Sequence, residues 1–97
     1  MKEELVELLE KSIDICFEKG ALKRMEIPFI EVDLPREDSH GDYASNIAMI
    51  LASNQRENPR KIAGLIIDNI EDNNIVEKIE IADPGFINFF IRKEMWT

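Results

Sequence analysis

The chain has 97 residues, with 20 Asp or Glu against 12 Lys or Arg, so its formal net charge is −8. This length supports one domain with one modest core, and a hydrophobic content of 44% excludes a disordered tail. The acidic balance argues against a basic nucleic-acid-binding domain. The chain is also too short for an enzyme that needs a nucleotide fold plus a substrate domain.

The cellular compartment follows from cysteine use and from the charge of the first residues. The only cysteine, Cys16, excludes an internal disulfide and favours a reducing compartment. Acidic residues at positions 3, 4, 7 and 10 exclude a secretory signal, and no uncharged stretch reaches the ~20 residues that span a bilayer. We therefore expect a soluble, cytoplasmic protein without a membrane partner.

Residues 3–19 are predicted to form an amphipathic helix that ends at Gly20. Its apolar stripe at helical spacing consists of Leu5, Val6, Leu8, Leu9, Ile13, Cys16 and Phe17. Because Cys16 belongs to that stripe and no histidine stands near it in sequence, we expect a core thiol rather than a nucleophile.

Residues 28–35 are predicted to form a strand bounded by two prolines, Pro28 and Pro35. An apolar set and an acidic set alternate along it: Ile30, Val32 and Leu34 with Glu31 and Asp33. We expect the apolar set to be buried and the acidic set to face water.

Two further helices are predicted after a polar break around Gly41. The first has apolar residues at helical spacing from Ala44 to Leu51 and ends near Ser53, with Asp42 placed to cap its first amides. The second begins at Asn58-Pro59, where Asn suits the cap and Pro suits the first helical position. Its expected buried face consists of Ile62, Ala63, Ile66 and Ile70. The short polar link between the helices predicts an antiparallel hairpin.

The last third of the chain is predicted to form a β-hairpin. Alternating residues around Ile79 and Ile81 lead into Asp83-Pro84-Gly85, which has the signature of a type II turn, and then into a strand over 86–91. The whole order of elements predicts an α+β domain of two layers: a small, mainly antiparallel sheet of three to four strands with helices packed on one face.

Signatures of catalysis are absent from the sequence. It contains no Gly-rich phosphate loop, no zinc-ligand spacing and no serine elbow. Ser39, His40 and Asp42 share one loop, where adjacent residues cannot normally adopt the geometry of a triad, so no catalytic residue is predicted. The loop also carries a crowded set of metal-ligand types, Glu37, Asp38, His40 and Asp42, but their spacing matches no metal motif, so no metal is predicted.

Two features suit an anionic or aromatic ligand. Arg56, Arg60 and Lys61 cluster at the start of the predicted third helix, where free amides and the helix dipole favour a phosphate; the alternative is an ordinary solvent-facing helix end. His40 and Tyr43 could stack on unpaired bases, although Tyr43 could instead pack against the start of the second helix.

Three motifs together resemble one family. They are His40-Gly41-Asp42-Tyr43-Ala44-Ser45-Asn46, then Asn58-Pro59-Arg60, then Ala82-Asp83-Pro84-Gly85-Phe86-Ile87-Asn88. In this order and at about this spacing, they are similar to motifs of the N-terminal additional domain of arginyl-tRNA synthetase. The third departs from the usual Ala-Gly-Pro-Gly at Asp83, and we expect the turn to survive because Pro84 and Gly85 remain.

The resemblance implies a role in tRNA recognition. Such a domain contacts the outer corner of arginine tRNA, chiefly the D-loop, as part of an arginine–tRNA ligase, a class I synthetase that attaches arginine using ATP and Mg²⁺. It implies an N-terminal domain over 1–91 and the start of a linker toward a catalytic domain over 92–97. The ATP-binding signature is absent, so this chain alone holds no cofactor and should not activate arginine.

The resemblance also implies partners and contact residues. The partners are arginine tRNA and the catalytic domain of the same chain, with no DNA and no membrane. The tRNA contact set is Glu37, His40, Asp42, Tyr43 and Asn46. The possible phosphate contacts remain the cations at the helix start, Arg56, Arg60 and Lys61, which the residues themselves suggest. The two acidic members would have to face a base edge, because a carboxylate repels phosphate. The competing hypothesis is a free-standing acidic domain that binds a protein through Glu31 and Asp33.

Overall fold

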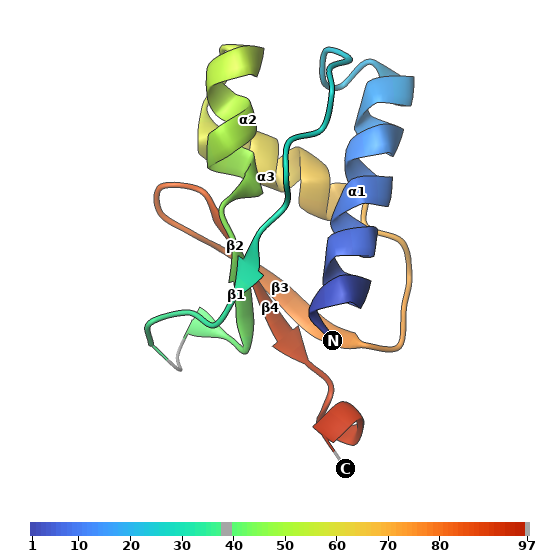
Figure 1. The fold of residues 1–97 in the computed structure, drawn as a ribbon, viewed down its shortest axis with the longest axis vertical. Coiled ribbons are helices and arrows are strands. Elements are labelled where there is room, and N and C mark those ends of the chain that lie inside the picture. Colours follow the sequence, from blue (N-terminus) through green and yellow to red (C-terminus); the bar gives the residue numbers. More distant parts are fainter. Residues whose placement is uncertain (38–39, 97) are drawn as a thin grey trace.

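The computed structural model describes residues 1–37 and 40–96, and Figure 1 shows helices packed against a small sheet. The elements are α1 (Lys2–Lys19), β1 (Val32–Asp33), β2 (Tyr43–Ser45), α2 (Ile47–Gln55), α3 (Pro59–Asp68), β3 (Val76–Ala82), β4 (Phe86–Ile91) and a 3₁₀ helix, η2 (Lys93–Trp96). All strand pairs are antiparallel, in the order β1-β2-β4-β3. The predicted α+β fold is confirmed.

The helix α1 forms as its sequence predicts. It ends at Gly20, which adopts a left-handed conformation with φ of 74° and donates its N–H to the carbonyls of Cys16 and Phe17. The free thiol of Cys16 is buried on the apolar face. Burial raises the pKa of this thiol, so it is an inert core residue.

The core lies between the helices and one face of the sheet. Ile87, Phe89 and Ile91 alternate along β4 and point into it. They meet the buried faces of the helices, which include Leu5, Leu9, Ile13, Ile47, Leu51, Ile62 and Ile66. Each such side chain contributes about 1.5–3 kcal/mol relative to exposure.

The predicted strand over 28–35 is much shorter in the structure. Only Val32 and Asp33 pair with a neighbour, opposite Ser45 and Ala44. The chain leaves the sheet after Asp33, although the register would place Leu34 opposite Tyr43 of β2. Leu34 is consequently 72% exposed, and its predicted place on the buried face is wrong.

The predicted start of the second helix at Ala44 is also wrong. Tyr43–Ser45 is the strand β2, which pairs with β4, and α2 begins only at Ile47, after Asn46. Asp42 lies before this strand and does not cap the helix; the nearest side-chain contact at this end is from the Ile47 N–H to Ser45 Oγ at 3.3 Å.

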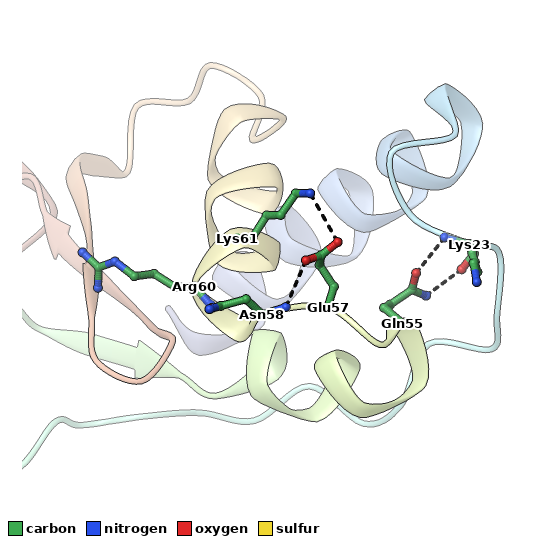
Figure 2. Close-up of polar contacts among 6 residues, drawn as sticks. All are labelled: Lys23, Gln55, Glu57, Asn58, Arg60 and Lys61. Atoms are coloured by element: carbon green, nitrogen blue, oxygen red, sulfur yellow. Dashed lines mark hydrogen bonds and ion pairs between the residues drawn. The ribbon is translucent and has the colours of Figure 1, made fainter.

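The helix α3 begins as predicted, because the Asn58 side chain accepts a hydrogen bond from the Arg60 N–H at 2.8 Å and Pro59 occupies the first turn. The antiparallel hairpin is not observed: α2 and α3 contact each other, but they cross obliquely (Figure 1). The chain turns sharply between them at Arg56, which has a left-handed φ of 54°. Gln55 exchanges two hydrogen bonds with the Lys23 backbone, tying the end of α2 to the turn after α1 (Figure 2).

The β3–β4 hairpin is confirmed, but its turn is not type II. A type II turn with Pro at its second position needs positive φ at Gly85, and the positive-φ glycines among the described residues are Gly20 and Gly41. The Asp83–Pro84 peptide is cis, and Asp83 does not adopt a positive φ. The space above Gly85 is filled instead: a Cβ there would lie 2.8 Å from Pro59 Cβ, so the turn packs directly on the start of α3.

Candidate functional site

A pocket of about 580 Å³ lies on the sheet face opposite the helices. The register places Ala44 opposite Asn88, and Ala82 opposite Phe86, on this one face, and these four residues form the floor. The walls come from β1 and the chain on either side of it, from the residue between β2 and α2, and from the hairpin turn: Glu31, Asp33, Leu34, Pro35, Arg36, Glu37, His40, Asn46 and Asp83. The pocket is therefore lined by residues of all four strands and of the chain next to β1.

Two side-chain oxygens at this pocket have no hydrogen-bond partner among the described residues. Asn88 is only 3% exposed, yet its Oδ1 is unpaired. Asn46 Oδ1, on the pocket wall, is unpaired as well. An unpaired buried acceptor costs about 1–3 kcal/mol, so a donor that reached either oxygen would relieve that cost.

Apolar surface borders these acceptors. Phe86 is 38% exposed at the pocket, and its ring lies on the same strand face as Asn88, two residues away. Leu34 and Pro35 supply further apolar surface on the opposite wall. A flat ring beside hydrogen-bond acceptors suits a planar ligand that has N–H donors at its edge.

The charge of the pocket is mostly negative. Its described lining residues include four carboxylates, on Glu31, Asp33, Glu37 and Asp83, and one guanidinium, on Arg36. A phosphate group would be repelled by this set, whereas a neutral ring with an amino group would not.

Three of the five predicted contact residues line the pocket: Glu37, His40 and Asn46. His40 and Glu37 lie at its rim, with 4.0 Å between His40 Nε2 and Glu37 Oε2. The His40 N–H also donates to the Glu37 carbonyl at 3.0 Å, which fixes the two side chains near each other.

Asp42 does not line the pocket but holds the loop against β4. Its N–H donates to the Phe89 carbonyl at 2.8 Å, and its Oδ2 accepts from the Ile91 N–H at 2.8 Å. Its neighbour Gly41 has a φ of 100°, and a Cβ there would lie only 2.7 Å from the Phe89 oxygen. Asp42 thus extends the β2–β4 pairing by one residue, with its side chain standing in for a backbone acceptor.

Tyr43 also lies outside the pocket lining. It faces the helix side of the sheet, because it pairs with the buried Phe89 and its side chain packs against the core. Its ring stacks on Trp96 of η2, with 6.5 Å between centroids and 18° between planes. The alternative role for this ring, packing rather than contact, fits its position.

The three predicted phosphate contacts point in different directions. Arg60 Nη1 lies 2.6 Å from Asp83 Oδ1, at the hairpin turn, whereas Lys61 Nζ lies 3.2 Å from Glu57 Oε2 (Figure 2). The Asn58 N–H and then Lys61 lower the pKa of Glu57, which favours the charged form of this carboxylate. Arg56 has no partner among the described residues, at the turn between α2 and α3. These cations do not form one anion site.

Sequence reasoning missed Phe86 and Asn88, which supply the exposed ring and the unpaired amide oxygen of the pocket floor. A signal for them is present: Asn88 is the one polar residue in the strand Phe86–Ile91 and shares its face with two phenylalanines. A single polar side chain between two phenylalanines on one face is the pattern that could have drawn attention to this position.

Other site types find no support in the described part of the chain. No three acidic, histidine or cysteine side chains are grouped there to hold a metal ion. Asp38 and Ser39, considered above for a metal set and a triad, lie outside the described residues. None of the described helices has the length and apolarity to cross a membrane.

A second, acidic groove of about 770 Å³ runs between α1 and the chain leading into β1. Its lining is Lys2, Glu3, Val6, Glu7, Glu10, Phe29, Ile30, Glu31, Val32 and Asp33. Phe29 is 83% exposed there, and Lys2 pairs with Asp33 at 3.2 Å. The predicted acidic face at Glu31 and Asp33 therefore borders both the pocket on the sheet face and the acidic groove.

Comparison with known proteins identifies close relatives among ligases. The chain is 48% identical over 97 residues to the arginine–tRNA ligase of Desulfosudis oleivorans and 47% identical over 91 residues to that of Shewanella piezotolerans. These matches cover 99% and 94% of this chain but only 17% and 16% of the relatives. The chain thus spans about one sixth of the length of these relatives.

Solved structures and a family model agree with this relationship. The arginyl-tRNA synthetase of Plasmodium falciparum superimposes with a TM-score of 0.77 at 26% identity, covering 96% of this chain and 16% of that one. The Thermus thermophilus arginyl-tRNA synthetase shares the fold, with a TM-score of 0.74 at 22% identity, covering 98% of this chain and 14% of the other. The model described as the arginyl tRNA synthetase N terminal domain matches residues 3–91. The chain therefore belongs to the family of arginyl-tRNA synthetase N-terminal domains.

Proposed function

We propose that the pocket on the open sheet face binds one unpaired base from the D-loop of arginine tRNA. The observation that carries this proposal is Asn88, which is 3% exposed and has an unpaired Oδ1 at the pocket floor beside the exposed ring of Phe86. A base offers what both lack: a flat face for the phenyl ring and edge N–H groups for the amide oxygen.

The wall residues then have distinct roles. His40 and Glu37 close the rim over the base, and Asn46 Oδ1 accepts a second hydrogen bond. Asp42 and Tyr43 hold the loop in place without touching the base, since neither lines the pocket. The carboxylates of the pocket steer the phosphate backbone away, so the base enters edge-first.

Phosphate contacts would be few. Arg60 and Lys61 each have a carboxylate partner, and only Arg56 at this helix end has none among the described residues. With few cations to displace counterions, we expect weak binding with a shallow dependence on salt. Other domains of the protein would then make most of the contacts with the tRNA phosphates.

We infer that the whole protein is a cytoplasmic arginine–tRNA ligase that uses ATP and Mg²⁺ in a catalytic domain outside this chain. Its relatives carry that name and are about six times longer than this chain. Residues 1–91 would be the tRNA-binding domain and 92–97 the start of the connection to the catalytic domain.

The test is an NMR titration of residues 1–97 with arginine tRNA, following the side-chain amides of Asn46 and Asn88. Both signals should shift, and tRNA with an altered D-loop should not shift them. Phe86→Ala should weaken binding about tenfold, as loss of one stacked base does, while Phe29→Ala, which removes an exposed phenyl outside the pocket, should leave it unchanged. Absence of shifts at low salt would refute the proposal.

In the whole ligase, His40→Ala should raise the KM for tRNA more than the KM for ATP. Equal effects on both constants would indicate a folding defect and would contradict a role for His40 at the pocket rim.

One observation favours a second role, binding of a cationic protein segment in the acidic groove. Phe29 is exposed there among five carboxylates and a single lysine, a combination that complements a segment of basic and apolar residues. Glu7→Lys with Glu10→Lys should abolish such binding without changing the affinity for tRNA at the pocket. Unchanged binding of a Lys- and Leu-containing peptide by that variant would refute this role.

A further inference from the structure

Trp96 lies on the far side of the sheet from the pocket. It belongs to η2, which follows β4, and it stacks on Tyr43 at 6.5 Å between ring centroids. Tyr43 points to the helix side, whereas its neighbour Ala44 points into the pocket. The stack therefore supports, from behind, the strand that forms part of the pocket floor.

The base of η2 is itself fixed to the sheet. The Arg92 N–H donates to the Ile75 carbonyl at 2.8 Å, and the Met95 N–H donates to the Arg92 carbonyl at 3.0 Å. These bonds continue the antiparallel edge of β3 and β4 into the 3₁₀ turn. Trp96, 55% exposed, is thus carried on a short, hydrogen-bonded support rather than on a free tail.

The loop ahead of Tyr43 is held to the same region. Asp42 bonds to Phe89 and Ile91, each at 2.8 Å, and Gly41 passes so close to Phe89 that no Cβ fits. His40, at the pocket rim, directly precedes Gly41 in the chain. A displacement of Tyr43 would therefore be transmitted through Asp42 and Gly41 to His40.

We propose that Trp96 is a positioning residue for the pocket: by stacking on Tyr43 it fixes the loop that carries His40, and it couples occupancy of the pocket to the packing of η2. This inference rests on the proposed function, since it needs a ligand in the pocket. Trp96 touches no ligand itself and acts only through Tyr43.

The experiment uses a spectroscopic property of this chain. Trp96 is its only tryptophan, so its emission, corrected for the absorbance of the tRNA, reports the stack. Residues 1–97 are titrated with arginine tRNA while the Trp96 emission and the Asn88 side-chain amide are followed in parallel. We expect both signals to change with the same apparent Kd.

Variants separate positioning from general stability. Trp96→Ala should weaken tRNA binding about threefold, as expected for loss of one aromatic pair, and Trp96→Phe should restore it. Met95→Ala, which removes an exposed side chain of the same turn outside the stack, is the control and should bind like the parent. Thermal unfolding of each variant checks that the fold is unchanged.

The outcomes distinguish the two proposals. If the Asn88 amide shifts while the Trp96 emission stays constant and Trp96→Ala binds normally, the positioning role is overturned and the base pocket stands. If neither signal changes, both proposals are overturned. If Trp96→Ala and Met95→Ala weaken binding equally, the effect comes from η2 as a whole and the role of the stack is refuted.

Discussion

Arg60 and Asp83 are separated by 23 residues in sequence, yet their side chains meet at 2.6 Å, from the Arg60 guanidinium to the Asp83 carboxylate. The pair joins the start of α3 to the β3–β4 turn, where Gly85 already packs on Pro59. Asp83 also lines the pocket. One carboxylate therefore neutralises a cation and borders the candidate base site at the same time.

Replacing Asp83 with Asn should tighten the binding of arginine tRNA about two- to threefold at low salt. The substitution removes a negative charge from the pocket wall and frees Arg60 to meet a phosphate. Stability should change by less than about 1 kcal/mol, because both partners are exposed to solvent. Filter binding at two salt concentrations measures the effect.

Glu80→Gln is the matched control for Asp83→Asn, because it removes the same charge from the same hairpin, where Glu80 pairs with Lys78 outside the pocket lining. This control should have a smaller effect on affinity. Weaker binding by Asp83→Asn would mean that the Asp83 carboxylate accepts a hydrogen bond from the base.

Replacing Asn88 with Ala should separate function from stability. The substitution removes a buried amide whose Oδ1 has no partner among the described residues, so the free energy of unfolding should change by less than about 1 kcal/mol. Binding of tRNA should nevertheless fall about tenfold, the effect of losing one hydrogen bond to a base edge. Denaturant unfolding and filter binding measure the two quantities.

The neighbouring substitution Ile87→Ala provides the contrast. Ile87 is fully buried on the opposite face of β4, so its truncation should destabilise the fold by about 2–5 kcal/mol. If Asn88→Ala destabilised the domain as much as Ile87→Ala, Asn88 would be a structural residue and its role in binding would be wrong.

Gly41→Ala should destabilise the domain by about 1–3 kcal/mol. The new Cβ would meet the Phe89 carbonyl oxygen at 2.7 Å, and the backbone has a φ of 100°. Gly64→Ala is the matched substitution: it lies within α3 with no atom near the new Cβ, so it should stabilise by about 0.5–1 kcal/mol. Opposite signs in thermal unfolding are expected, and equal signs would contradict the close contact at Gly41.

The pKa of Glu57 should lie below its ordinary value, chiefly because the Asn58 N–H donates to the carboxylate and secondarily because of Lys61. A carboxyl group with a lowered pKa in the folded state stabilises the fold above its unfolded pKa, and this contribution is lost as pH falls through the folded pKa. Stability should therefore decrease in that acidic range, and Glu57→Gln should remove this part of the decrease.

A carbon-detected NMR titration of Glu57 measures this pKa directly. Lys61→Met should leave it below the ordinary value, because the backbone donor remains. A return to the ordinary value in Lys61→Met would assign the whole effect to the ion pair.

The helices α1 and α3 could be predicted from sequence because their signals are local. Seven apolar residues at helical spacing define α1, and Asn58-Pro59 forms the cap that its residue types favour. The fold class follows from the order of such elements. For the same reason the buried state of Cys16 was predictable.

Other features depend on contacts that are distant in sequence. Tyr43–Ser45 is a strand because β1 and β4 pair with it, and its residues run without a break into a helical pattern. Asp42 has the residue type and position of a helix cap, but its carboxylate instead accepts a hydrogen bond from the Ile91 N–H, 49 residues away. Leu34 fits the alternation, yet the chain leaves the sheet after Asp33, so Leu34 does not pair with β2.

The strand β4 lies between β2 and β3, so the backbone beneath Asn88 is hydrogen-bonded on both sides. Its amides should therefore exchange with solvent only on global unfolding, whereas those of the wall over 34–37 should exchange far faster. Binding of a base would then cost little conformational entropy at the pocket floor. Most of the conformational entropy lost on binding would come from ordering the wall over 34–37. The opening of this wall would then set how quickly a bound nucleotide is released.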